Sequence, residues 1–413
     1  MIVEDILRVL YAPHKVFKDV IQKPGYLGPF ILLLIFAVAQ VGSSYVVASR
    51  SYIEQTMPIG DEGDIWTENA ALWQAGLGVT IRNNTVDFIN STLYYGSTSI
   101  EFAASNASNV WMELNNLDTS VNCGADGFKN ISLRVKLVTP DAKPENVSIY
   151  LHSLSGSAFY YDLTQTFSSS DVNVWNNITL TVGSGDWLSS SADATWKNIT
   201  GLKMEFTWSS KSSIILRIDG LFFRGDFQDP LERYGSSYLI SSALDAIAPF
   251  LFEWLLMTGL MYLLIKGLKG NVVWRPLMVA VGFALVTLVV QALILAVVYT
   301  SLPSLFYPLE VLAGVTGEFE VAYQVILDKI AFVTLVGGII QSVVYVWIVA
   351  LGTFITRAIT GDEKIAEQVR MGKVASDTII SRDVTEFGWM KCLLVSGLSL
   401  FLTIIILGLL LGI

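Results

Sequence analysis

The chain has 413 residues and a formal net charge of −10, with 53% hydrophobic but only 15% charged residues. Its mean hydropathy is +0.54. Soluble domains carry about 25% charged residues, so this composition argues against an ordinary water-soluble protein. The acidic balance argues against a nucleic-acid partner. The length leaves room for a bundle of membrane helices and one further domain.

Five stretches are long and apolar enough to cross a bilayer, because each approaches the ~20 apolar residues that the hydrocarbon core requires. They are 27–48, 241–265, 276–300, 329–355 and 392–413. The first is longer than the apolar region of a cleavable signal, which is about 7–15 residues. We therefore expect it to remain in the protein as a signal anchor.

Two amphipathic segments flank these spans. Segment 1–26 precedes the first span and is interrupted by Pro13, and segment 357–391 precedes the last span. Both place apolar residues at roughly helical spacing among charges, which is typical of helices in the lipid headgroup region. Each is predicted to be cytoplasmic, either covering the bundle or docking a cytoplasmic partner.

Lysine and arginine predict the orientation of the spans. Cations cluster in 1–26, in the link 266–275 and in 357–391, whereas 301–328 carries four carboxylates and no cation. Because cytoplasmic loops are enriched in Lys and Arg, we expect a cytoplasmic N-terminus. Segment 50–240 and the C-terminus are then extracytoplasmic, and the protein is a multi-pass integral membrane protein in contact with membrane lipids.

The sequons agree with that orientation. Seven Asn-x-Ser/Thr sequences occur, all within 50–240: Asn83, Asn90, Asn106, Asn130, Asn146, Asn177 and Asn198. A domain rich in Ser, Thr and Asn also produces sequons by accident. We predict glycosylation of this segment, in a host that has the machinery, and hence an external location.

Segment 61–227 changes to a two-residue hydrophobic period. Lys129–Leu137, Val147–Leu151, Ile178–Val182 and Leu202–Trp208 all alternate apolar and polar residues. Such runs, separated by Gly, Ser, Asn and Asp, predict half-buried strands of a sandwich. The predicted fold is therefore a membrane α-helical bundle of five transmembrane helices plus an extracytoplasmic all-β jelly-roll or β-sandwich domain.

The last strands of this segment include four aromatic-rich stretches, which are Trp175–Thr179, Asp186-Trp187, Trp196–Lys203 and Ile218–Phe223. These stretches resemble the final strands of jelly-roll domains of the carbohydrate-binding-module type. It implies that Trp175, Trp187 and Trp196 could stack on sugar rings, although tryptophans of a sandwich are usually core residues. It also implies a Ca²⁺ site at Asp219, which could equally just form the Asp-Gly turn. No other cofactor or metal site is expected.

Two short motifs stand beside the spans. The first is Leu10-Tyr11-Ala12-Pro13 with Phe17 and Pro24, and the second is the turn Lys266–Gly270. Together with the five spans they resemble the Yip family, multi-span membrane proteins named for interacting with Ypt/Rab GTPases. The Asp-Leu-Tyr-Gly-Pro signature of the eukaryotic members is absent, so GTPase binding is not implied. The large insert between the first two spans also departs from the family.

Four polar residues fall at about one depth of the predicted bundle: Gln40, Glu253, Gln291 and Gln341. An ionised carboxylate such as Glu253 costs several kcal/mol at this depth. The four could line a proton or substrate site, or they could only hold helices together through hydrogen bonds of ~0.6 kcal/mol each.

The sequence predicts a binding protein rather than an enzyme, because no phosphate loop, nucleophile elbow or zinc-protease motif occurs. The first hypothesis is a non-enzymatic, Yip-like membrane protein that presents a glycosylated outer domain at the cell surface to a glycan or a protein. The alternative is a transporter or channel-like subunit that uses the polar layer around Glu253. A homo-oligomer or a larger membrane complex fits either hypothesis.

Overall fold

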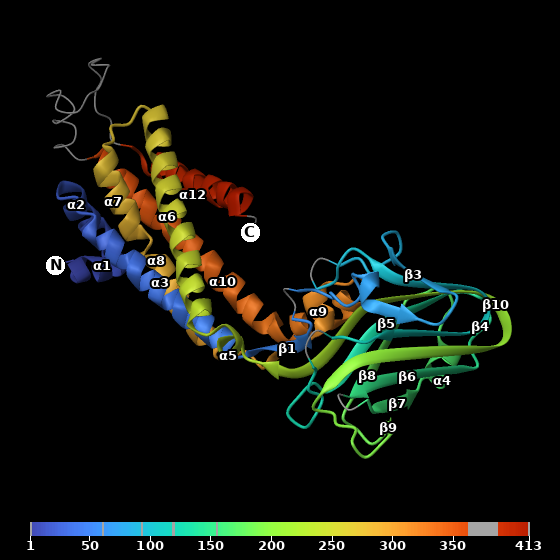
Figure 1. Cartoon of the computed structure of the whole chain (residues 1–413). Coiled ribbons are helices and arrows are strands. Elements are labelled where there is room, and N and C mark those ends of the chain that lie inside the picture. Colours follow the sequence, from blue (N-terminus) through green and yellow to red (C-terminus); the bar gives the residue numbers. More distant parts are fainter. Residues whose placement is uncertain are drawn as a thin grey trace. The chain divides into compact units, whose positions relative to one another are not determined.

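The computed structural model describes residues 2–59, 62–91, 94–117, 120–153, 156–361 and 387–411. The chain forms two compact units, each made of separated segments. The helical unit contains 1–50, 230–304 and 329–413. The second unit contains 51–229 and 305–328, and we call it the outer unit after the location that the sequence predicts for it. Figure 1 shows the helices and strands of both units.

The helical unit begins with two short amphipathic helices, separated at Pro13 as expected from the sequence. The helices are α1 (Ile2–Tyr11), α2 (Pro13–Gln22), α3 (Leu27–Ala48), α5 (Pro230–Tyr234), α6 (Ser236–Gly267), α7 (Trp274–Ala284), α8 (Val286–Tyr299), α10 (Glu318–Thr360, which begins in the outer unit) and α12 (Trp389–Leu411). Val9, Val16 and Phe17 are fully buried, so the apolar face of α1 and α2 packs inside this unit.

Five helical stretches are long and apolar enough to span a membrane within the described residues: Leu27–Ala48, Ser237–Gly267, Trp274–Tyr299, Glu318–Thr360 and Trp389–Leu410. They coincide with the five predicted spans. Two details differ. The third stretch is divided into α7 and α8 at Leu285, and α10 starts about ten residues before the predicted span. Most of the predicted amphipathic link, 362–386, lies outside the described residues.

The outer unit is a large, almost entirely antiparallel sheet that folds over on itself. Its strands are β1 (Ser51–Met57), β2 (Trp73–Ala75), β3 (Val79–Asn84), β4 (Ser99–Leu114), β5 (Asn130–Thr139), β6 (Asn146–Ser153), β7 (Ala158–Asp162), β8 (Asn176–Thr181), β9 (Leu188–Ser189), β10 (Ile199–Gln228) and β11 (Leu305–Tyr307). The short helices η1 (Ala70–Leu72), α4 (Thr164–Ser169) and α9 (Leu309–Ala313) complete it.

Two long strands join two layers. The first part of β10 pairs with the end of β4 and with β6, whereas its later part pairs with the start of β4 and with β5. We call the sheet region β2-β4-β10-β6-β7-β9 the β6 layer and the region β3-β4-β10-β5-β8 the β5 layer. This architecture is a β-sandwich, as the alternating runs predicted.

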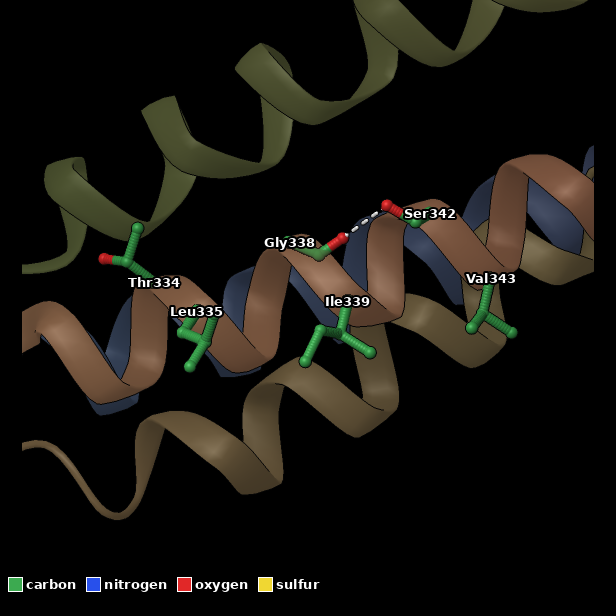
Figure 2. Close-up of a pocket in the computed structure, with 6 residues that line it drawn as sticks. All are labelled: Thr334, Leu335, Gly338, Ile339, Ser342 and Val343. Carbon is green, nitrogen blue, oxygen red and sulfur yellow. Dashed lines mark hydrogen bonds between the residues drawn. The ribbon is translucent and has the colours of Figure 1, made fainter.

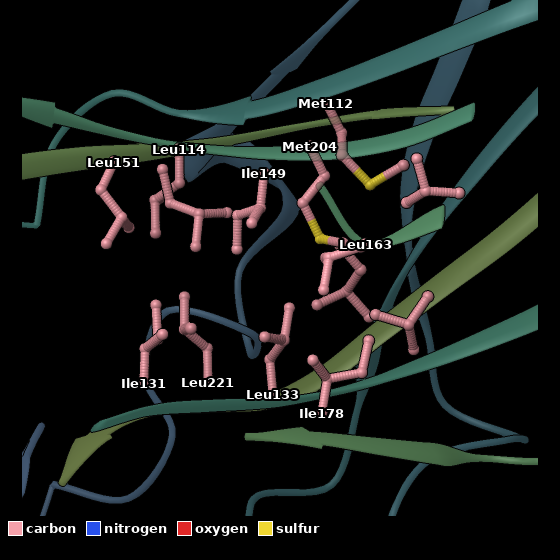
Figure 3. Close-up of a cluster of buried hydrophobic side chains, with 14 of the residues drawn as sticks. Met112, Leu114, Ile131, Leu133, Ile149, Leu151, Leu163, Ile178, Met204 and Leu221 are labelled. Carbon is pink, nitrogen blue, oxygen red and sulfur yellow. The ribbon is translucent and has the colours of Figure 1, made fainter. Parts of the chain in front are cut away.

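The apolar residues of the alternating runs form the core between the layers. Met112, Ile149 and Met204 from the β6 layer face Leu133 and Ile178 from the β5 layer (Figure 3), and all five are at most 2% exposed. The intervening residues of the β6-layer strands therefore point out of the sandwich.

The outer unit includes a segment that the sequence assigned to a separate loop. Strand β11, from the link between the third and fourth spans, pairs in parallel with β1. Arg224 of β10 donates hydrogen bonds of 2.8 Å to both oxygens of Glu54 in β1. It also donates bonds of 2.7 and 3.0 Å to both oxygens of Glu310 in α9. One guanidinium thus joins three distant parts of the chain.

A second arginine holds the start of α10 to the sheet. Arg134 of β5 forms an ion pair with Glu318 and donates a hydrogen bond to the Tyr95 hydroxyl. Between the two arginines, Leu309 and Ala313 pack with Phe222 in a small apolar cluster of their own. Segment 305–328 is therefore an integral part of the outer unit.

We predict that Arg224→Met destabilises the outer unit by about 3 kcal/mol, because it leaves the buried Glu54 carboxylate without its charge partner. Glu310→Gln, which keeps the arginine paired with Glu54, should cost about 1 kcal/mol. Denaturant unfolding of the full chain in detergent, followed by tryptophan fluorescence, measures both, since seven of the eleven tryptophans lie in 51–229.

Lys211→Ala is the matched control for this prediction, because Lys211 is an exposed cation on the same strand. It should change the free energy of unfolding by less than about 0.5 kcal/mol. Equal stability of Arg224→Met and Lys211→Ala would contradict the role given to Arg224.

Candidate functional site

The outward side of the β6 layer carries aromatic and polar side chains from four adjacent strands. We call the set Trp111, Tyr150, Tyr160 and Lys203 the aromatic face. Tyr150 of β6 lies directly opposite Lys203 of β10 on one side and Tyr160 of β7 on the other. Trp111 of β4 lies opposite Glu205, two residues from Lys203 on the same strand. These residues alternate with core residues, so the strand pleat places them on one surface.

The rings of the aromatic face lie side by side. The centroids of Tyr150 and Tyr160 are 5.3 Å apart, with the ring planes tilted by 52°. The Lys203 ammonium is 5.3 Å from the Trp111 ring centroid and 5.5 Å from that of Tyr150. All four side chains are half-buried by their neighbours. The result is a row of apolar plates with a cation between two of them.

Hydrogen-bonding groups border this row. Asn109 Nδ2 donates to Glu205 Oε1 at 3.2 Å and to Thr207 Oγ1 at 3.0 Å. Glu113 Oε1 lies 2.9 Å from His152 Nε2. Donors and acceptors fixed beside aromatic planes are suited to a ligand that has both apolar faces and hydroxyl groups.

An exposed leucine lies at each end of the row. Leu188 of β9 is opposite Tyr160 and is 65% exposed. Leu77 is fully exposed in the turn after β2, next to Gly76, whose amide donates to the Trp111 carbonyl at 3.2 Å. From β4 to β7 the row takes three inter-strand steps of about 4.8 Å, which gives it a length of roughly 14 Å. The two leucines lie beyond its ends.

The carboxylates of Glu113, Asp162 and Glu205 lie around the Lys203 cation of the aromatic face, so its border is acidic. Burial, together with the charge of Glu205 and the neighbouring Tyr160, raises the pKa of Tyr150, so its hydroxyl stays protonated at neutral pH. Hydrogen bonds from Thr164 lower the pKa of Asp162, which borders the face on β7. An uncharged ligand therefore meets less repulsion here than an anionic one.

The three tryptophans that the sequence suggested for sugar stacking lie elsewhere. Trp187 is 5% exposed and its Nε1 donates to the Thr181 carbonyl. Trp196 stacks on Phe159, with centroids 3.7 Å apart. Trp175 Nε1 donates to Asp87 at 3.3 Å. Packed in these positions, none of the three belongs to the aromatic face.

A pattern in the sequence could have identified Trp111 and Tyr150 as outward-facing residues of their strands. Each stands between two core residues of an alternating strand, Val110 and Met112 in the first case and Ile149 and Leu151 in the second. A large aromatic residue at an outward position of such a run indicates a surface function more directly than the presence of tryptophan does.

The sequon asparagines lie at the surface of the outer unit. Asn83, Asn90, Asn106, Asn146 and Asn177 are exposed, and Asn130 and Asn198 are half-buried. All seven side chains are thus at least partly accessible, and their glycosylation stays a prediction.

Three carboxylates gather where the outer-unit loops meet β10. Asp64, Glu68 and Asp219 each offer an oxygen, and these oxygens lie within 4.8 Å of one another. Backbone amides support them: Gly96 donates to Asp64 at 2.7 Å, and Ile89 donates to Asp219 at 2.6 Å. Asp219, which the sequence offered as a calcium ligand or a turn residue, is 1% exposed.

This cluster can hold a hard cation or a proton. Burial, and then the neighbouring Asp64, raises the pKa of Asp219 well above its ordinary value. The pair therefore avoids two adjacent buried charges either by sharing a proton or by binding a cation. Carboxylate oxygens are the ligands that Ca²⁺ prefers, so the donor set fits the ion that the sequence suggested.

Part of the predicted polar layer forms a connected group in the helical unit. Gln291 of α8 donates a hydrogen bond to Gln341 of α10. Glu253 of α6 is half-buried beside the buried Trp254. Gln40 of α3 is half-buried and takes no part in these contacts among the described residues.

A shallow groove on α10 lacks such polar partners. Thr334, Leu335, Gly338, Ile339, Ser342 and Val343 line it (Figure 2). The Ser342 hydroxyl donates to the Gly338 carbonyl of its own helix at 2.8 Å, as serine often does inside helices. The groove therefore offers a ligand little beyond apolar contact.

No protein-family model and no curated protein matches the chain. Among solved structures, a family 11 carbohydrate-binding module from Clostridium thermocellum, in complex with a β-1,3-1,4-mixed-linked tetrasaccharide, is similar. It has 12% identity over 38% of this chain and 91% of the module, with a TM-score of 0.26.

An exo-β-agarase is similar over 42% of this chain and 25% of its own length, with 11% identity and a TM-score of 0.30. A β-1,2-glucanase from Parabacteroides distasonis is similar over 38% of this chain and 24% of its own, with 12% identity and a TM-score of 0.29. These values are too low to support a functional argument.

We predict that Ca²⁺ stabilises the outer unit. At a free concentration 100 times the dissociation constant, the gain is about 2.7 kcal/mol. The gain should be larger at pH 7.5 than at pH 5, because the raised pKa of Asp219 makes protons compete with the cation. Thermal unfolding of the full chain, with chelator or with Ca²⁺, measures it.

Asp219→Asn should abolish this response to Ca²⁺, whereas Asp193→Asn, at an exposed position of the same unit, should leave it intact. A wild-type unfolding temperature that does not respond to millimolar Ca²⁺ at either pH would show that the carboxylates share a proton instead.

Proposed function

We propose that the protein is a membrane-anchored, non-enzymatic receptor whose outer unit binds an extracytoplasmic glycan on its aromatic face. The observation that carries the proposal is the row of Trp111, Tyr150 and Tyr160 across adjacent strands. Sugar rings have apolar faces that stack on aromatic plates and hydroxyls that need nearby polar partners. The face supplies both within one rigid sheet.

The shape and charge of the face favour an extended, uncharged glycan. A row of roughly 14 Å, with Leu77 and Leu188 beyond its ends, has room for several sugar rings laid across the strands. The carboxylates of Glu113 and Glu205 border it, so uronates and sulfated sugars are disfavoured.

Anchoring in a membrane is part of the proposal. Five long apolar helical stretches support it, since exposed residues such as Val38, Phe332 and Leu409 suit contact with lipid. The positive-inside pattern supports a location of the outer unit outside the cytoplasm. We also propose that the helical unit is Yip-like, on the N-terminal and Lys266–Gly270 sequences alone and without GTPase binding.

We predict that the full chain in nanodiscs binds neutral oligosaccharides of four or more rings on a glycan array, and longer chains better than short ones. Trp111→Ala and Tyr150→Ala should each weaken binding at least tenfold, because each removes one stacking plate worth about 1.4 kcal/mol. Isothermal titration with the best array ligand measures the loss.

Trp175→Phe is the matched control, since Trp175 is equally half-buried but lies outside the aromatic face. It should keep wild-type affinity. If Trp175→Phe loses binding and Trp111→Ala keeps it, the binding site does not lie on the aromatic face. If the chain binds no neutral glycan on the array, the proposed function is wrong.

A further inference from the structure

Two neighbouring turns of the helical unit carry exposed cations. One turn follows α2, and the other links α6 to α7. Stretches 20–28 and 262–278, which contain these turns, hold no carboxylate, and among the residues that the structure describes none of their cations forms an ion pair. We call these cations the basic cluster: Lys23, Lys266, Lys269 and Arg275.

Arg275 joins the two turns. Its Nη2 donates a hydrogen bond of 3.2 Å to the Pro24 carbonyl, and its guanidinium lies 5.8 Å from the centroid of the Tyr26 ring. Helix α7, near whose start Arg275 lies, packs against both α2 and α3 (Figure 1). The arginine is therefore fixed beside the residue that follows Lys23.

Aromatic rings place Lys266 at the same end of the helical unit. Lys266 Nζ is 6.0 Å from the centroid of the Tyr262 ring, which lies on the preceding turn of α6. That ring packs edge-on against Trp274, with centroids 5.5 Å apart, and Trp274 directly precedes Arg275. Tyrosine and tryptophan favour the headgroup region of a bilayer, so these rings suit the depth at which lipid phosphates lie.

Lys269 adopts a backbone conformation that favours glycine. Its φ is +65°, in the left-handed region in which helices usually end on glycine. Two hydrogen bonds close the turn, from the Lys269 amide to the Lys266 carbonyl at 2.9 Å and from the Gly270 amide to the Ile265 carbonyl at 2.8 Å. Glycine at position 269 would close it with less strain. A cation kept at such a position indicates a function for its charge.

The surroundings of the basic cluster fit a phospholipid with a net negative headgroup. A guanidinium donates paired N–H groups to phosphate oxygens, and ammonium groups add point charges. Four cations without a carboxylate leave an excess positive charge, which a zwitterionic headgroup with its own cation balances less well. Leu263 and Leu268, 64% and 38% exposed, flank Lys266 in the sequence. They offer apolar surface to acyl chains, which a free phosphate ion does not have.

We propose that the basic cluster is a binding site for an anionic phospholipid, whose phosphate accepts hydrogen bonds from Arg275, Lys266 and Lys269. Lys23 adds a further positive charge from the adjoining turn. The helical unit thereby selects lipids at the end that the loop charges predict to be cytoplasmic, in addition to anchoring the outer unit. The proposal rests on the helices lying in lipid but not on glycan binding.

The test is native mass spectrometry of the full chain in detergent, titrated with phosphatidylglycerol or with phosphatidylcholine of the same acyl chains. We expect the first phosphatidylglycerol to bind at least about tenfold more tightly, because several cations contribute to its affinity. Lys269→Gly should reduce this preference about fivefold. It should also unfold at no lower temperature than the wild type, since glycine suits the left-handed turn. Arg275→Gln should reduce the preference at least as much, because its amide is uncharged.

Arg50→Gln is the matched control, because Arg50 is an exposed cation just beyond the opposite end of α3. It should keep the full preference for phosphatidylglycerol. Equal affinities of the wild type for the two lipids would overturn the proposal, and so would equal losses in Arg50→Gln and Lys269→Gly. Displacement of phosphatidylglycerol by millimolar inorganic phosphate would also overturn it, since the cluster would then bind a free anion. Release of the chain from membranes by alkaline extraction would separately contradict the membrane location.

Discussion

The rest of the outer unit depends on the hydrogen bonds that the Arg224 guanidinium donates to Glu54 and Glu310. Two carboxylates, Glu54 and Glu310, come from opposite ends of the unit's sequence and share one guanidinium. Burial lowers the pKa of Arg224, but the two carboxylates raise it by more. The guanidinium therefore stays charged. Glu54 also accepts from the Leu309 amide at 2.7 Å. Removing the arginine would leave two partly buried anions together.

Strand β10 connects Arg224 to the other features of the outer unit. Lys203 and Glu205 lie near its start, and Asp219 and Arg224 lie in its last third. The aromatic face, the carboxylate cluster and the attachment of segment 305–328 are thus arranged along one continuous strand. Because 305–328 pairs with 51–229, both must lie on the same side of any membrane, which agrees with the orientation predicted from the loop charges.

Local patterns in the sequence predicted the spans and most of the strands, since periods of 2 and long apolar runs need only neighbouring residues. The pairing of Glu310 and Glu318 with Arg224 and Arg134 joins residues 86 and 184 positions apart. No local pattern encodes such a pairing, so the four carboxylates of 301–328 looked like an ordinary acidic loop. The sequence analysis did not find the aromatic face because it selected residues by type. Trp111 and Trp187 are both tryptophans, and they differ in burial, since Trp187 is buried and Trp111 is only half-buried.

The common sidedness of the two outer segments is tested most directly by cysteine accessibility in sealed cells. Cys123 and Cys392 are buried, so a membrane-impermeant maleimide should report mainly on introduced cysteines. Lys211→Cys and Glu320→Cys should both be labelled in intact cells, and Lys266→Cys only after permeabilisation. Labelling of Lys211→Cys without Glu320→Cys, or of Lys266→Cys in intact cells, would contradict the account.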